Sequence, residues 1–124
     1  MARILVVDDS GLSRRTLRRI LEAAGHEVAE AVDGISALEH YFLDRPDLVL
    51  MDLVMGGMYG LEALEKLRQL DPQARVIVAT ADIQSSTRHL AEAGGASGLV
   101  TKPFSAEQVV GAVNTVLAGG ATWS

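Results

Sequence analysis

Four short apolar runs in the sequence each end at a polar side chain. The runs cover residues 4–7, 48–51, 76–79 and 99–101, and the polar residues that end them are Asp8 and Asp9, Asp52, Thr80, and Lys102. If the runs are parallel strands of one sheet, these side chains meet at its carboxyl edge, where open α/β sheets bind their ligands. The pattern therefore predicts one small cleft that holds carboxylates, a hydroxyl and an ammonium group.

The segments between the apolar runs have helical periodicity. Apolar and small residues recur at spacings of three and four, and the expected helices cover residues 12–24, 35–42, 61–68, 83–93 and 106–117. Gly25 is expected to end the first helix and Ser105 to cap the last. Residues 26–31 have mixed polarity and are expected to form an edge strand. Near-continuous apolar strands that alternate with helices are typical of a doubly wound α/β domain, here a parallel sheet of five strands with five helices.

Length and composition exclude several classes of protein. The chain has 124 residues, and we expect one domain over residues 1–118 with a flexible tail over 119–124. A net charge of −5 argues against direct nucleic-acid binding, and the absence of cysteine excludes disulfides and thiol catalysis. No run is long enough to cross a membrane, and no signal peptide precedes the first strand, so we expect a cytoplasmic domain that is monomeric or weakly dimeric.

The expected cleft is suited to phosphoryl chemistry. Several carboxylates in one cleft repel each other, so at neutral pH one is protonated or a cation binds. Oxygen ligands without cysteine or paired histidine favour a hard cation, and Mg²⁺ is the expected cofactor. Asp52 is the natural nucleophile for an aspartyl phosphate, because it stands between the acid pair and the other two groups. Lys102 would neutralise a phosphate oxygen, and the Thr80 hydroxyl would donate to another.

The same motifs resemble those of response regulator receiver domains. The matching segments are Asp8-Asp9-Ser10, Asp52-Leu53-Val54-Met55, Thr80-Ala81 and Lys102-Pro103-Phe104, in that order along the chain. Gly95-Ala96-Ser97-Gly98 adds similarity to the stand-alone, chemotaxis-type members. The resemblance covers nearly the whole chain and implies a flavodoxin-like sheet of strand order 2-1-3-4-5.

The resemblance also implies a role for each residue of the cleft. Asp52 would accept a phosphoryl group from the phosphohistidine of a sensor histidine kinase or a histidine-phosphotransfer protein. Mg²⁺ would be bound by Asp9, Asp52 and the Val54 carbonyl, with Asp8 acting through water. Thr80 would move toward the phosphoryl group and Lys102 would pair with it, and the bond from Lys102 to Pro103 would be cis. An output protein would read the change, and no turnover of an external substrate is expected.

Three positions depart from the pattern of the resembled family. Gly56 stands where a proline is usual, so we expect a more mobile loop there. Tyr59 stands where an Asp or Asn commonly caps the third helix, and Leu99 replaces an aromatic residue that often moves with Thr80. These departures concern transmission of the signal rather than the phosphorylation chemistry.

The motifs and the function each have an alternative interpretation. Asp8 and Asp9 could merely cap the first helix. Arg14, Arg15, Arg18 and Arg19 form a basic face, which is either solvated with partners such as Glu22 or a docking site for a phosphotransfer protein. The rival functions are a degenerate receiver that ignores phosphate, an aspartate-nucleophile phosphatase and a flavin carrier. A phosphatase of that kind would need a second acid at the position of Ser10. A flavin carrier would need a phosphate-binding loop after the first strand, where the acid pair would repel the phosphate.

Overall fold

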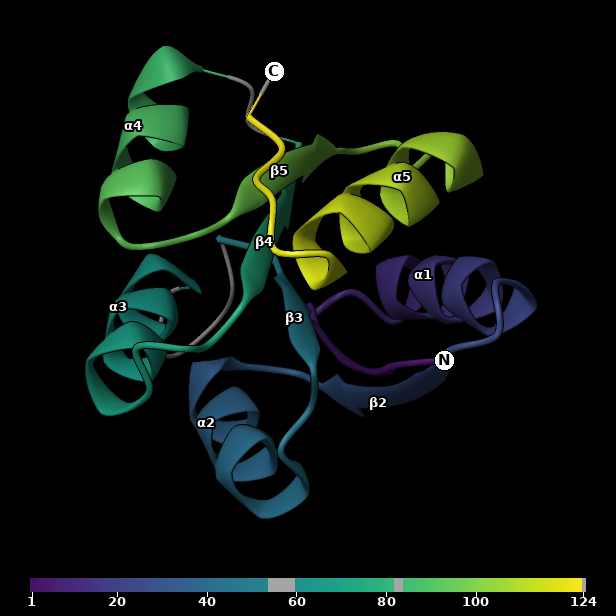
Figure 1. Cartoon of the computed structure of the whole chain (residues 1–124), viewed down its shortest axis with the longest axis horizontal. Helices are drawn as coiled ribbons and strands as arrows, with labels where there is room; N and C mark the ends of the chain where they lie inside the picture. Colours follow the sequence, from purple (N-terminus) through teal and green to yellow (C-terminus); the bar gives the residue numbers. More distant parts are fainter. Residues whose placement is uncertain (54–59, 82–83, 124) are drawn as a thin grey trace.

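The computed structural model describes residues 1–53, 60–81 and 84–123 of the chain. Strands and helices alternate along this part in the predicted order (Figure 1). Their bounds are β1 Arg3–Val7, α1 Gly11–Ala23, β2 Glu27–Ala31, α2 Gly34–Asp44, β3 Leu48–Met51, α3 Gly60–Leu70, β4 Val76–Thr80, α4 Ser85–Ala93, β5 Gly98–Thr101 and α5 Ala106–Leu117.

The sheet has five strands in the order β2-β1-β3-β4-β5, and each neighbouring pair is parallel. The predicted fold class and strand order are therefore confirmed. The three inner strands are buried along nearly their whole length, whereas β2 has a half-buried pattern. The mixed polarity of residues 26–31 thus correctly indicated an edge strand, because an edge strand has solvent beside it.

Successive side chains of the inner strands enter two separate apolar layers. Leu5 and Val7 face one layer, which α2, α3 and α4 cover, and Ile4 and Val6 face the other, which α1 and α5 cover. Figure 1 shows this division of the helices between the two faces of the sheet. Burial on both faces explains why these strands are apolar at every position rather than at every second one.

Local capping chemistry sets most of the helix ends. The Ser10, Asp33 and Ser105 side chains each accept a hydrogen bond from a backbone N–H in the first turn of α1, α2 and α5. Gly25, just after α1, has a φ of 92°, as predicted for a helix stop. The acids after β1 therefore do not cap α1, since Ser10 occupies that position.

Two of the residues that mark the first two helices face solvent. Leu12 and Ile35 were among the residues used to recognise α1 and α2, yet they are 68% and 56% exposed. In α2, Ala37 and Tyr41 are buried in the apolar layer, and Leu38 and Phe42 pack against it, with Phe42 edge-on to Tyr41. The periodicity correctly located these helices, but the first apolar residue of each lies beyond the part of the helix that the sheet covers.

The C-terminal segment (residues 119–123) lies against β5. Thr122 forms an isolated parallel bridge with Gly98, and Trp123 packs against the apolar layer that α3 and α4 cover. The domain boundary at residue 118 stays a prediction. Within the described residues, no helix has the length and apolar character needed to cross a membrane.

Candidate functional site

The polar side chains predicted to share one cleft follow adjacent strands. Asp8 follows β1, Asp52 follows β3, Thr80 ends β4 and Lys102 follows β5, and these strands are neighbours in the sheet. Asp8, Asp52 and Thr80 are 1%, 7% and 2% exposed, and they are the polar residues buried in the described part of the chain. A parallel sheet with this strand order thus brings the four groups to one edge.

Lys102 connects two of the carboxylates. Its Nζ lies 2.9 Å from Asp52 Oδ2 and 2.9 Å from Asp8 Oδ2. Burial by itself would lower the pKa of the lysine, but the two carboxylates more than compensate, and the pKa of Lys102 lies above its ordinary value. The ammonium group is therefore charged at neutral pH and partly offsets the repulsion between the acids.

The carboxylate of Asp8 is held by the start of α1. Its Oδ1 accepts a hydrogen bond of 2.9 Å from the Ser10 N–H. Its Oδ2 is buried and has no hydrogen bond of acceptable geometry in the described residues, although the Lys102 ammonium lies beside it. A buried carboxylate oxygen with remaining acceptor capacity fits a hard cation, so the donor chemistry agrees with Mg²⁺.

The full ligand set expected for that cation is only partly visible. Asp9 is exposed beside the buried Asp8, and Val54 lies outside the described residues, as do Gly56 and Tyr59. Among the residues that are described, no group of three His, Asp or Glu side chains is arranged to hold a metal ion. The assignment of Asp8, Asp9, Asp52 and Val54 as ligands therefore stays a prediction.

Thr80 and Lys102 are joined through their backbones. The Lys102 N–H donates to the Thr80 carbonyl at 3.0 Å, and Thr80 pairs with Thr101 across β4 and β5. The bond from Lys102 to Pro103 is cis, as the resemblance implied. The Leu99 side chain, three residues earlier, is partly buried and packs against the apolar layer on the α4 side.

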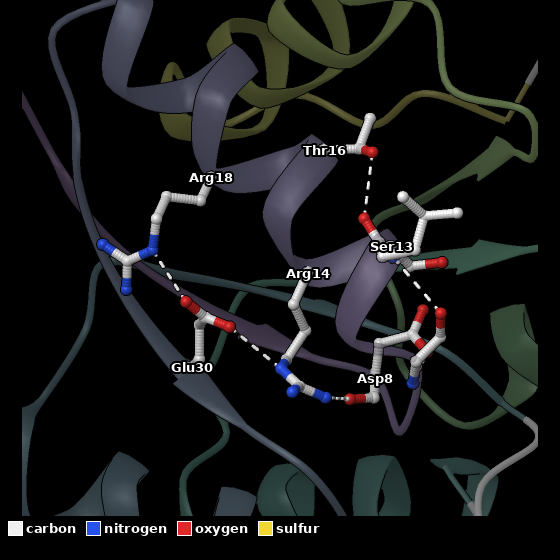
Figure 2. Close-up of polar contacts among 8 residues, drawn as sticks. Asp8, Ser13, Arg14, Thr16, Arg18 and Glu30 are labelled. Carbon is white, nitrogen blue, oxygen red and sulfur yellow. Dashed lines mark hydrogen bonds and ion pairs between the residues drawn. The ribbon is translucent and has the colours of Figure 1, made fainter.

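The basic face of α1 includes a structural network that the sequence did not reveal. Arg14 Nη1 donates to the Asp8 carbonyl oxygen at 2.6 Å, and Arg14 Nε donates to Glu30 Oε1 at 2.9 Å (Figure 2). The other oxygen of Glu30 accepts from Arg18 Nε at 2.7 Å, and Arg18 also pairs with Glu22, as expected. Arg14 thus connects the end of β1 to β2.

Electrostatics within this network favour the charged forms. The hydrogen bond from Arg18 holds the pKa of Glu30 below its usual value, with Arg14 adding to the effect against the cost of burial. The same contact raises the pKa of Arg18. Half of the predicted solvated face is therefore engaged with β2, while Arg15 and Arg19 remain exposed.

Gly60, at the start of α3, is a second residue that the sequence analysis missed. A Cβ atom there would overlap the backbone carbonyl of Asp52, and the Gly60 N–H donates to the Leu53 carbonyl at 2.9 Å. Only glycine allows the backbone of α3 to approach the backbone of Asp52 so closely. Its place at the end of a glycine-rich loop is a signal that could have indicated this approach.

Comparisons with known proteins agree with this geometry. The model of the response regulator receiver domain family matches residues 4–114. The chain is 43% identical over 116 residues to the chemotaxis protein CheY of Bacillus subtilis. This alignment covers 93% of this chain and 97% of that protein. It is 40% identical over 115 residues to the CheY of Thermotoga maritima, with coverage of 92% and 96%.

Solved structures give the same result. The crystal structure of a two-component response regulator of the LuxR family from Aurantimonas superposes with a TM-score of 0.94 at 38% identity, covering all of this chain and 90% of that one. CheY in the complex of CheX, CheY, BeF3 and Mg²⁺ from Borrelia burgdorferi has a TM-score of 0.88 at 28% identity, with coverage of 92% and 87%. The matched segments include all four strand ends of the site. The chain therefore belongs to the response regulator receiver domain family and is of the CheY type.

Proposed function

We propose that the chain is a phosphorylation-dependent signalling switch in which Asp52 is the phosphoacceptor. The observation that supports this most directly is the position of the Lys102 ammonium, 2.9 Å from one oxygen each of Asp8 and Asp52. A cation placed beside a buried carboxylate is suited to bind the dianionic group that forms there. The sensor kinase or histidine-phosphotransfer protein that supplies the group and the output protein that reads it belong to this proposal.

The transfer uses few protein groups, and each has a definite task. The carboxylate of Asp52 forms a bond to phosphorus while the bond between phosphorus and the donor nitrogen breaks, and the donor imidazole leaves with that electron pair. Lys102 exchanges its carboxylate partner for a phosphoryl oxygen, and the Thr80 hydroxyl donates to another. Asp8, Asp9, Asp52 and the Val54 carbonyl would hold Mg²⁺, which would neutralise charge on the carboxylates and the phosphoryl group.

The reaction takes place on the chain itself. We therefore expect phosphorylation and slow dephosphorylation of Asp52, and no turnover of an external substrate. A soluble acyl phosphate can replace the protein donor, because the receiver side holds the residues that position and neutralise the transferred group.

Intact-mass measurement tests the proposal. The protein is mixed with acetyl phosphate and Mg²⁺, and the addition of one phosphoryl group is expected. Asp52→Asn should abolish the addition, while Asp44→Asn, a change to a carboxylate on the outer side of α2, should leave it unchanged. An unmodified wild-type protein, or an addition that survives Asp52→Asn, would refute the proposal and favour a receiver that ignores phosphate.

A further inference from the structure

The C-terminal segment (residues 119–123) pairs with the outer edge of β5 through one isolated bridge. The Thr122 N–H donates to the Ser97 carbonyl at 2.9 Å, and the Thr122 carbonyl accepts from the Leu99 N–H at 3.3 Å. These bonds produce the parallel bridge between Thr122 and Gly98. Figure 1 shows the segment, in yellow, running beside β5.

The segment crosses from one face of the sheet to the other. It leaves α5, which covers the same face as α1, and turns at Gly119, whose φ is 97°. The Gly120 N–H bonds to the Thr115 carbonyl at 3.0 Å. Trp123 then packs against the opposite apolar layer, as Leu99 does. The segment therefore connects the helix α5 to the layer beneath α3 and α4.

The residue at position 98 is adapted to this contact. A Cβ atom on Gly98 would lie 2.8 Å from both Thr122 Cγ2 and Thr122 O. Gly98 is therefore small enough to let the backbone of the segment approach β5, and any larger residue there would push the segment away.

β5 also connects this contact to the phosphoacceptor site. The strand has four residues, or roughly 13 Å at the usual rise, with the segment bound near its first residues and Lys102 directly after its last. In the proposed function, loading of Asp52 gives the Lys102 ammonium a phosphoryl oxygen as a partner in place of the Asp52 carboxylate. Lys102 is also bonded through its backbone N–H to the Thr80 carbonyl, so a displacement of either residue on loading would reach the strand to which the segment is bound.

We propose that residues 119–123 are a displaceable segment, and that phosphorylation of Asp52 releases it from β5. This inference rests on the proposed function. Two backbone bonds join the described part of the segment to residues 97 and 99, and Thr122 and Trp123 are only half-buried, as is typical of segments that open at low free-energy cost. Release uncovers an edge that fits an extended segment of a partner protein, with backbone pairing to residues 97–99 and an apolar side chain in the place of Trp123.

A purely protective role for the segment is the competing explanation. Edge strands are commonly covered so that they do not pair with other chains. A protective cover would remain in place whether or not Asp52 is loaded. The two explanations therefore differ in one measurable property, the response of the segment to phosphorylation.

Trp123 provides the first test, because it is the only tryptophan in the sequence. Wild-type protein receives Mg²⁺ and acetyl phosphate, and the same samples are measured for mass, tryptophan emission and amide hydrogen exchange. With Asp52 loaded, we expect a red shift of the emission and roughly fivefold or faster exchange at Leu99, in the range of ordinary coupling between sites. Asp52→Asn should show neither change.

The outcomes separate this inference from the proposed function. Phosphorylation without a change in emission or in Leu99 exchange would overturn the inference and leave the proposed function standing. A failure to add the phosphoryl group would refute the proposed function, and the inference with it.

Thermodynamic linkage gives a second test that does not require the covalent product. If loading favours release of the segment by some factor, then release must favour loading by that same factor. A variant whose segment is already released should therefore bind Mg²⁺ with beryllium trifluoride more tightly than wild type. Thr122→Pro removes the N–H that bonds to Ser97, while the control Thr122→Val keeps the backbone and the side-chain shape. We expect tighter binding for Thr122→Pro alone. Equal affinity in both variants, with circular dichroism showing that both are folded, would overturn the inference.

Discussion

The inner strands of the sheet differ from its two edge strands in burial and in what they hold. β1, β3 and β4 are enclosed on both sides and end at the buried Asp8, Asp52 and Thr80. β2 and β5 are half-buried. The contacts of Glu30 in β2 with Arg14 and Arg18, and those of β5 with the C-terminal segment, are exposed to solvent at least in part. The two buried carboxylates and the Thr80 hydroxyl thus belong to enclosed strands, whereas Lys102 follows an edge strand.

The physical reason for this difference is backbone pairing. An inner strand has neighbours that satisfy its N–H and C=O groups on both sides. Together with close packing of its side chains, this pairing holds the end of the strand in place. An edge strand leaves one row of these groups free to pair with something else. β2 uses a charged network beside this edge, and β5 uses the residues that follow α5. Four predictions test how far the distinction holds.

Lys102→Ala should have the largest effect on stability. It leaves the buried Asp8 and Asp52 without the neighbouring ammonium, and breaking a buried ion pair from one side costs about 3 kcal/mol. Urea unfolding should show this loss, and Mg²⁺ should restore part of it because the ion replaces the missing charge. Lys66→Ala, on the exposed side of α3, is the control. Equal stability of both variants would contradict the buried-charge argument.

Gly60→Ala should have the second-largest effect on stability, since the new Cβ would overlap the Asp52 carbonyl. Forced overpacking of this kind costs about 2 kcal/mol, and phosphorylation by acetyl phosphate should slow because Asp52 is displaced. Gly111→Ala is a matched control in the open middle of α5, where nothing lies within 4 Å, and it should stabilise the protein by about 0.5 kcal/mol. Thermal unfolding of both variants gives the comparison, and two changes of the same sign would contradict it.

Arg14→Ala tests whether the edge strand influences the site. The substitution frees the Asp8 carbonyl and removes one partner of Glu30, so the affinity for Mg²⁺ should fall about tenfold, as for other groups that orient metal ligands. Calorimetric titration with Mg²⁺ measures this, and the exposed Arg15→Ala serves as control. An unchanged affinity in Arg14→Ala would confine the network to a structural role.

Glu30→Gln should have the smallest effect, and it should depend on pH. The pKa of Glu30 is lower in the folded chain than its ordinary value of 4.5, so its ion pairs stabilise the protein above that pH. This stabilisation is lost as the pH falls through the lowered pKa. The variant should therefore be less stable than wild type at neutral pH, by less than about 1 kcal/mol, and equal to it in acid. Urea midpoints across the acid range test the convergence.

Much of the fold was predictable from local patterns. The apolar runs, the caps at Ser10 and Ser105 and the glycine stop at residue 25 are properties of short segments, and each marked an element in the right place. The exposure of the first apolar residue in α1 and in α2 was not predictable in this way. Leu12 and Ile35 fit the helical period but face solvent, since the part of a helix that the sheet covers depends on how the helix packs.

In the candidate site, too, some features were predictable from the sequence and others were not. The residue types and their positions after the strands indicated Asp8, Asp52, Thr80 and Lys102, and the parallel sheet brings them to one edge. The role of Arg14 was not predicted, because nothing distinguishes it from the other arginines of the same helix until the position of β2 is known. Trp123 was expected to lie in a flexible tail, and its packing against the sheet follows from the path of residues 119–122.

By itself, the sequence determined the elements, their order and the chemistry available at the strand ends, because periodicity, capping and residue type act over a few neighbouring residues. The tertiary structure alone decided that Lys102 lies between Asp8 and Asp52, and that Trp123 reaches the layer opposite α5. Lys102 and Asp52 are 50 positions apart in the chain. Contacts over such separations depend on strand register and on helix packing, which no short segment of the sequence contains.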